Sequence, residues 1–217
     1  FTDAFRKWFG DSKVVDKDGK PLMVYHGMAN EMEGGEFRPS TYGTLGEGIY
    51  FTSSPEAASN FATGVRGDKT EAQTQGNVVP TYLRIEEPFD DNFFVGNKEW
   101  QDWAAGILRY GQDASYKYWA SNAAFRWGIT PEEEGTKTIE ALHKKLMDGN
   151  ATLNDLVFLN DEVVEAPWGK KILEAVKAHG GFDGVIFKNS TKGFDEYVVF
   201  KPNQIKSATG NTGAFDI

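Results

Sequence analysis

The chain has 217 residues, 40% of them hydrophobic, which is enough to bury the core of one globular domain that carries an insertion. Its formal net charge of -9 disfavours non-specific binding to nucleic acid, because such binding needs clustered Lys and Arg side chains. The sequence contains no cysteine, which excludes disulfides, thiolate metal sites and a cysteine nucleophile.

The N-terminus carries no recognisable signal peptide. The chain starts with Phe1 rather than with methionine, so we expect it to be a fragment of a longer protein. All apolar runs are shorter than the roughly 18 residues of a membrane-spanning helix, and we therefore predict no membrane span.

Residues 14–27 read VVDKDGKPLMVYHG, which predicts two short strands joined by a tight turn. Asp18 and Gly19 are typical of turns, and Pro21 cannot donate a hydrogen bond within a central strand. DKDG also resembles the start of a calcium-binding loop, but its glycine comes two positions early and no liganding acid follows at the twelfth position. We therefore prefer the turn.

Residues 31–48 are rich in glycine and lack periodicity, which predicts a long loop of the kind that often binds ligands. The segment GIYFT that follows predicts a short strand. The strand leads into a helix with Ser54 as its expected N-cap and Pro55 as its first residue. The apolar face of this helix is expected to consist of Ala57, Ala58, Phe61 and Ala62.

Residues 78–85, VVPTYLRI, predict another strand. From residue 98 onward the sequence is helical and aromatic, with Trp100 and Trp103 at helical spacing. A stripe of tryptophans is more often core than ligand site. We expect residues 98–165 to be a helical insertion within a single domain that covers residues 1–217.

The last third of the chain predicts one helix and two further strands. Pro167 opens the helix, and Gly180 or Gly181 ends it as the C-terminal cap. The strands are expected in FDGVIFKN and in DEYVVFKPNQI.

Glu196 has an unusual place in the last of these segments. In a strand, Glu196, Val198 and Phe200 share one face, and an unpaired carboxylate is costly to bury among apolar groups. Either this strand end is exposed to water, or Glu196 faces a cleft in which a partner accepts its charge.

His26 ends an apolar strand and precedes Gly27, so its ring is expected where the next backbone atoms are approachable. Taken alone, His26 is interpreted equally well as a structural residue. His143 and His179 lie on predicted helices, and no H-E-x-x-H motif is present, so we reject a zinc site. GTLGEG fits neither the P-loop nor the dinucleotide fingerprint, and no G-x-S-x-G elbow indicates a serine hydrolase.

Three segments, VYHG, GEGIYFTSSPEAASNF and DEYVVF, follow one another in this order. They resemble the signature segments of the poly(ADP-ribose) polymerase and diphtheria toxin group of ADP-ribosyltransferases. The opening FRKWFGDSKVVDKDGKPLMVYHG and the end FKPNQIKSATGNTGAFD look like the version of this domain found in bacteriophage polyvalent proteins and related prophage toxins. The resemblance covers residues 1–90 and 165–217, but not the helical middle.

This resemblance implies an α+β fold in which split antiparallel β-sheets form a cleft for the co-substrate NAD. It implies that Gly27 holds the nicotinamide carboxamide through its backbone and that His26 hydrogen-bonds the adenosine ribose. Tyr50 and Phe61 would stack on the two sides of the nicotinamide ring.

The resemblance also implies the catalytic set Glu196, His26 and Tyr50. A carboxylate beside the ribose stabilises the positive charge that develops when the bond to nicotinamide breaks, and it orients a sugar hydroxyl. The helix serine that touches the carboxamide in the polymerases aligns with Ala58, so Ser59, one position away, is the nearest candidate for that contact.

We therefore expect a mono-ADP-ribosyltransferase of a phage or bacterial toxin or effector type, which needs NAD but no metal. Protein is the favoured acceptor because the chain is acidic, while RNA and DNA stay open. An arginine acceptor is not supported, because Phe194 stands two positions before Glu196, where arginine-modifying toxins carry Glu or Gln. The segment NSTKGFD, residues 189–195, either faces the acceptor or is an ordinary turn.

Two alternatives stay open. An NAD glycohydrolase would use water as the acceptor, and a non-catalytic module would bind NAD or ADP-ribose without consuming it. We expect the protein to act in the cytoplasm of a bacterial host or target cell, reached by secretion or injection as part of a larger protein, with no membrane partner.

Overall fold

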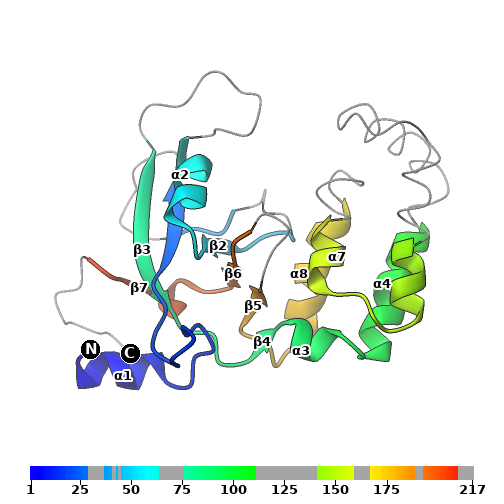
Figure 1. Cartoon of the computed structure of the whole chain (residues 1–217), viewed down its shortest axis with the longest axis horizontal. Helices are drawn as coiled ribbons and strands as arrows, with labels where there is room; N and C mark the ends of the chain where they lie inside the picture. The colour runs from blue at the N-terminus through cyan, green and yellow to red at the C-terminus, as the bar shows by residue number, and fades with distance from the viewer. Residues whose placement is uncertain are drawn as a thin grey trace. The chain divides into compact units, whose positions relative to one another are not determined.

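The computed structural model describes residues 1–28, 37–40, 43, 45–63, 76–110, 141–158, 167–188 and 193–209. They form an α+β structure with one seven-stranded sheet in the order β4-β5-β6-β2-β1-β3-β7 (Figure 1). The expected fold class is confirmed. The chain divides into two compact units: Phe1–Thr41, Gly48–Pro88 and His179–Ile217 make the first, and Tyr42–Glu47 and Phe89–Ala178 make the second. The expected single domain with an insertion at residues 98–165 stays a prediction.

The first unit contains six of the strands, and the pairings between them are antiparallel. The edge strand β4 (Pro88–Phe89) lies next to β5. The six strands are β1 (Val24–Met28), β2 (Ile49–Thr52), β3 (Asn77–Leu83), β5 (Gly184–Phe187), β6 (Glu196–Val199) and β7 (Ile205–Ser207).

One face of this sheet buries the core of the first unit. Val24, Phe51, Leu83, Tyr197 and Val199 belong to this core and are at most 3% exposed. Because side chains alternate along a strand, the residues between them point to the opposite face of the sheet. The opposite face carries the candidate site.

The segment before β1 forms the predicted turn, but not the first of the two predicted strands. A single bridge joins Val15 to Pro21, and the Asp16 carboxylate accepts the N–H groups of Asp18 and Lys20 at 2.8 and 2.9 Å. Gly19 has a φ of 74°, a left-handed conformation that favours glycine. The Asp16 side chain therefore closes the turn itself.

The predicted helix after β2 is α2 (Pro55–Thr63), which lies along β1 and β3 (Figure 1). Ser54 caps it as expected, because its Oγ accepts the Ala57 N–H at 3.1 Å. The expected apolar face is only partly correct: Ala58 and Ala62 are buried, whereas Phe61 is 42% exposed. The helix contacts the sheet through its small residues, which keep its backbone close to the strands.

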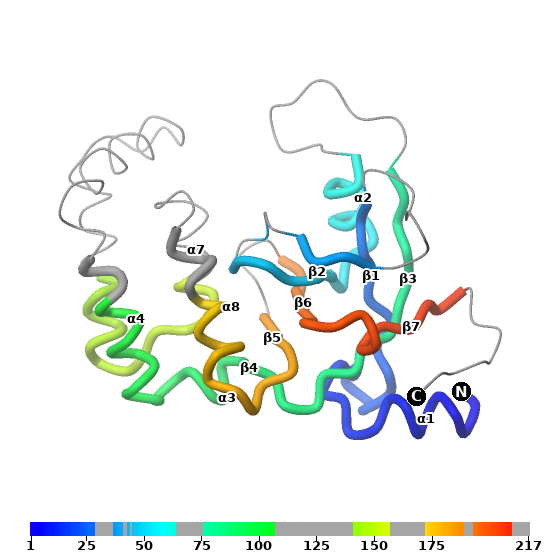
Figure 2. The backbone as a smooth tube through the Cα atoms, turned by 180° about the vertical axis from the view of Figure 1, so that it is seen from behind, coloured from blue at the N-terminus to red at the C-terminus, as the bar shows by residue number. Residues whose placement is uncertain are grey.

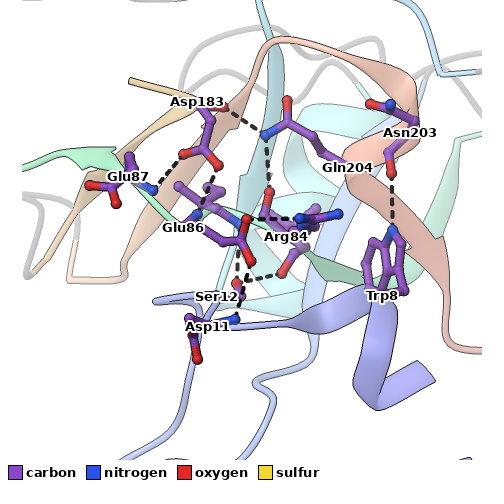
Figure 3. Close-up of polar contacts among 11 residues, drawn as sticks. Trp8, Asp11, Ser12, Arg84, Glu86, Glu87, Asp183, Asn203 and Gln204 are labelled. Carbon is purple, nitrogen blue, oxygen red and sulfur yellow. Dashed lines mark hydrogen bonds and ion pairs between the residues drawn. The ribbon is translucent and has the colours of Figure 1, made fainter. Parts of the chain in front are cut away.

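The last predicted strand is interrupted. After β6, Pro202–Gln204 form the short 3-10 helix η3 before β7 begins. Pro202 has no N–H to donate to a ladder. Gln204 has its side chain buried, where the amide nitrogen donates to the carbonyl oxygens of Arg84 and Asp183 at 3.0 and 2.7 Å (Figure 3).

The N-terminal helix α1 (Asp3–Phe9) is attached to the same region. Its Trp8 indole donates to the carbonyl oxygen of Asn203 at 3.1 Å, and the Asp183 carboxylate accepts the backbone N–H groups of Glu86 and Glu87 (Figure 3). These polar contacts join α1 to the segment before β7, and the segment after β3 to the segment before β5.

Among its described residues, the second unit consists mainly of helices. Trp100 is 7% exposed and packs on Phe89, with ring centroids 4.7 Å apart, which favours the structural interpretation of this tryptophan. Residues 141–147 are also helical. The helices with defined bounds are α3 (Asp91–Phe94), α4 (Lys98–Tyr110), α7 (Leu153–Phe158) and α8 (Pro167–His179).

Pro167 opens α8 as predicted, and Gly180 and Gly181 follow it with φ angles of 71° and 94°. Such left-handed glycines are common at helix ends. Among the described residues, no helix has the length and apolar character that crossing a membrane requires.

Candidate active site

The candidate site lies where two neighbouring strands stop pairing. β2 runs between β6 and β1 (Figure 2). It pairs with β6 over its whole length, but within the described strands its one register pair with β1 is Tyr25–Thr52. β1 instead continues along β3 as far as Met28. The split that we expected between two sheets is thus found within a single sheet, whose two parts are joined at one pair.

His26 connects β1 to β2 beyond that pair. Its Nδ1 lies 2.7 Å from the carbonyl oxygen of Tyr50, and a carbonyl can only accept, so Nδ1 carries the hydrogen. Burial lowers the pKa of His26 below its usual value of 6.5, which favours the neutral ring. In that form Nε2 is a hydrogen-bond acceptor.

The His26 ring lies on the core face of the sheet. Its centroid is 5.3 Å from that of Phe37 and 5.2 Å from that of Phe51, and Phe51 belongs to the core. His26 therefore reaches the backbone of Tyr50 from the face opposite to the Tyr50 ring.

Gly27 points to the other face, toward α2. A Cβ atom at Gly27 would lie 2.0 Å from the Ala58 carbonyl oxygen and 3.0 Å from the Ala62 nitrogen. No real side chain tolerates such distances to backbone atoms, so only glycine lets α2 approach β1 this closely. This contact places α2 on the same face as Tyr25, two residues earlier in the strand.

Tyr50, Thr52 and Glu196 share that face as well. Thr52 is opposite Tyr25 on one side and opposite Glu196 on the other, and directly opposite residues of antiparallel strands project to the same face. Tyr50 is two residues before Thr52 along β2. Glu196 is partly exposed at the start of β6, as expected if this strand end is exposed to water.

Asp195 anchors the start of β6, a role that the sequence analysis missed. Its carboxylate lies 3.3 Å from the Lys188 ammonium and accepts the Tyr197 hydroxyl at 3.3 Å. Its backbone N–H donates to the Ser53 Oγ at 2.9 Å. The signal was a lysine near the end of one predicted strand and an aspartate at the start of the next, which become neighbours if those strands form a hairpin.

Tyr197 supports this anchor from the core. Burial, together with the Asp195 charge, raises the pKa of the Tyr197 phenol well above its usual value, so the hydroxyl keeps its hydrogen and donates it. The position of Glu196 is thus held by groups on both sides of its strand.

The structure brings most of the predicted site residues into one region. Gly27, Tyr50 and Glu196 share a face, and His26 contacts the backbone of Tyr50 from the other face. Ser59 is exposed on α2, as is Phe61. The roles of all these residues stay predictions. The predicted loops at residues 31–48 and 189–195 lie partly outside the described residues.

The described residues contain no group of three or more His, Asp or Glu side chains arranged to hold a metal ion. For NAD, the region offers an exposed aromatic on α2, a partly exposed carboxylate and a strand edge whose pairing has ended. These are groups that a nicotinamide ring, a ribose and a carboxamide could contact.

A family model described as ADP-ribosyltransferase in polyvalent proteins matches residues 16–215. This match includes the helical middle, which the sequence resemblance did not cover. Neither the curated proteins nor the solved structures gave a match. Since the match extends over nearly the whole chain, the protein belongs to the family of ADP-ribosyltransferases in polyvalent proteins.

Proposed function

We propose that this domain is a mono-ADP-ribosyltransferase that cleaves NAD and transfers ADP-ribose to a macromolecule, with Glu196 as its catalytic residue. The family supports ADP-ribosyl transfer with NAD as co-substrate. The acceptor that we favour is a protein, because an acidic chain with a net charge of -9 binds a phosphate backbone poorly.

The observation that carries this proposal is the position of Glu196. Its carboxylate is on the face of Tyr50, on the strand that pairs with β2, and is only partly buried. β6 pairs with one edge of β2, and β1 separates from the other edge. A carboxylate on the fully paired strand has a fixed position, so it is suited to stabilise a cation that forms beside it.

In the reaction the bond between the nicotinamide nitrogen and the ribose carbon breaks, and the bonding electrons leave with nicotinamide. The sugar gains oxocarbenium character, which Glu196 stabilises electrostatically while it orients a ribose hydroxyl. A nucleophilic atom of the acceptor then bonds to the same carbon and loses its proton.

Most of the other residues would bind the nicotinamide half of NAD. Tyr50 and Phe61 stack on the ring, and the exposure of Phe61 leaves its face accessible. Gly27 offers backbone groups to the carboxamide, with Ser59 as a further contact. His26 holds the Tyr50 carbonyl and offers Nε2 to a hydroxyl of the adenosine ribose.

The test compares the wild-type protein with Glu196→Gln in NAD turnover, measured as nicotinamide release. We expect a loss of about 10²–10³ in rate, the size seen when one preorganised electrostatic group is removed. Glu174→Gln, at an exposed position of α8, is the matched control and should keep full activity. Full activity of Glu196→Gln would remove this residue from the mechanism.

Label from NAD identifies the acceptor and separates the alternatives. The protein is incubated with labelled NAD and with host protein, RNA and DNA in parallel, followed by mass spectrometry. Label on protein supports the proposal, whereas release of free ADP-ribose alone supports an NAD glycohydrolase. Binding of NAD without any turnover would indicate a non-catalytic module.

The proposed setting is a phage or bacterial effector that acts inside a bacterial cell. The family description supports the connection with polyvalent proteins. A labelled protein found in bacterial lysate and absent with Glu196→Gln would support this setting.

A further inference from the structure

We infer that Thr52 is a positioning residue for Glu196, with its hydroxyl donating a hydrogen bond to the Glu196 carboxylate. This inference rests on the proposed function of Glu196 and adds a residue to the same site. It derives from three properties of Thr52: its register, its burial and the hydrogen bond that it already accepts.

The register brings the two side chains close together. Beside this pair, the Ser53 N–H donates to the Asp195 carbonyl oxygen at 2.9 Å, and the Asp195 N–H donates to the Ser53 hydroxyl. Ser53 and Asp195 thus occupy a hydrogen-bonded position, which makes the adjacent pair of Thr52 and Glu196 the non-hydrogen-bonded type. In such pairs the Cα atoms are about 4.5 Å apart and the side chains are at their closest.

Because Thr52 is buried, its hydroxyl hydrogen needs an acceptor within the protein. Thr52 is 3% exposed, and its Oγ1 accepts the Ser54 N–H at 3.1 Å. A hydroxyl has one hydrogen to donate, and buried polar groups are almost always hydrogen-bonded. An ionised carboxylate accepts only, so Glu196, directly across the strand, is a matching partner once its side chain turns toward Thr52. Among the described residues, the structure itself pairs Thr52 Oγ1 with the Ser54 N–H.

The neighbour of Glu196 on the other side of β6 cannot donate a hydrogen bond to its carboxylate. On β5 the residue facing Glu196 is Phe187, whose side chain has no donor. Of the two cross-strand neighbours, only Thr52 has a hydrogen to donate to the carboxylate.

This hydrogen bond would select one orientation of the Glu196 side chain. Asp195 fixes the backbone at the start of β6, and a donor on the neighbouring strand would fix the carboxylate. A catalytic group held in this way needs less reorganisation when the ribose cation forms.

A purely structural role for Thr52 is the competing interpretation. Its bond to the Ser54 N–H shapes the turn from β2 into α2, and that alone would explain a buried threonine. The two interpretations differ in one respect: only a positioning residue loses its effect on catalysis once the Glu196 carboxylate is gone.

The test is a double-mutant cycle in nicotinamide release with Thr52→Val, Glu196→Gln and the combined variant, each checked by thermal unfolding. In the wild-type background, Thr52→Val should lower kcat about tenfold, the effect of one charge-assisted hydrogen bond, with little change in KM. In the Glu196→Gln background it should lower kcat by less than about twofold. Thr52→Ser keeps the hydroxyl and should stay within about twofold of the wild-type protein.

An equal loss from Thr52→Val in both backgrounds would overturn the inference and leave the proposed function intact. A wild-type protein that releases no nicotinamide, or an unimpaired Glu196→Gln, would contradict the proposed function itself. If Thr52→Val does not fold, Thr52→Cys takes its place in the cycle, because a thiol has a similar size and is a weak donor.

Discussion

The two edges of β2 differ sharply in how they pair. Toward β6 the ladder covers all four residues of β2 and continues through the contacts of Ser53 with Asp195. Toward β1 the described strands have the single register pair Tyr25–Thr52, and beyond it the His26 side chain bonds to the Tyr50 carbonyl.

An active site of the proposed kind has two requirements, a fixed carboxylate and an accessible place for a planar ligand, and the two edges of β2 suit one requirement each. In the proposed mechanism the carboxylate of Glu196 needs a fixed position, which the fully paired edge would supply through backbone hydrogen bonds. A planar ligand needs backbone groups and aromatic faces beside a strand edge, and in the proposed site the edge toward β1 supplies them. β2 can therefore meet both requirements, because its two edges differ in how they pair.

The largest expected effect comes from the contact between α2 and β1. Gly27→Ala would place a Cβ 2.0 Å from the Ala58 carbonyl oxygen, so α2 must move away from the edge where β1 separates. We expect the free energy of unfolding to fall by about 3 kcal/mol, the upper part of the range for overpacking. Chemical denaturation of the two proteins measures this loss.

The matched control for Gly27→Ala is Gly106→Ala on α4. A Cβ at Gly106 would meet nothing within 4 Å, and alanine is the better helix former by about 0.5–1 kcal/mol. This variant should be as stable as the wild-type protein or more so. A stable Gly27→Ala variant would show that α2 does not need its close contact with β1.

A smaller effect is expected at Tyr50. If its ring stacks on nicotinamide, Tyr50→Ala should weaken NAD binding by about 1–3 kcal/mol through the loss of stacking and burial. Tyr50→Phe keeps the ring and should bind nearly as well as the wild-type protein. Calorimetric titration gives both affinities, and an unchanged affinity of Tyr50→Ala would contradict its place in the site.

The smallest effect concerns the pH dependence of the connection between β1 and β2. Burial lowers the pKa of His26 in the folded protein below the usual 6.5, so the unfolded chain binds the proton more readily. The stability that the neutral ring contributes is complete above pH 6.5 and is lost as the pH falls through the lower value of the folded state.

His26→Gln can still donate to the Tyr50 carbonyl but cannot titrate. As the pH is lowered below 6.5, the midpoint of thermal unfolding should therefore fall less steeply in the variant than in the wild-type protein. Parallel curves for the two proteins would mean that protonation of His26 does not weaken this edge.

Local chemistry made several elements predictable. Ser54 and Pro55 fixed the start of α2 through a cap that involves only neighbouring residues, and Gly180 ended α8 for a similarly local reason. The exposure of Phe61 was missed, because helical spacing cannot tell which side of a helix meets the sheet. The break at Pro202 could have been found from its missing N–H.

The sequence by itself determined the residue types of the candidate site, because words such as VYHG, GIYF and DEYVVF can be recognised without coordinates. It also determined where α2 starts and where α8 starts and ends, since caps depend on nearby residues. The tertiary structure alone decided that β1 leaves β2 after one pair, that His26 joins them from the core face, and that Thr52 stands opposite Glu196. Strand register depends on contacts between residues far apart in the chain, and no local pattern specifies those contacts.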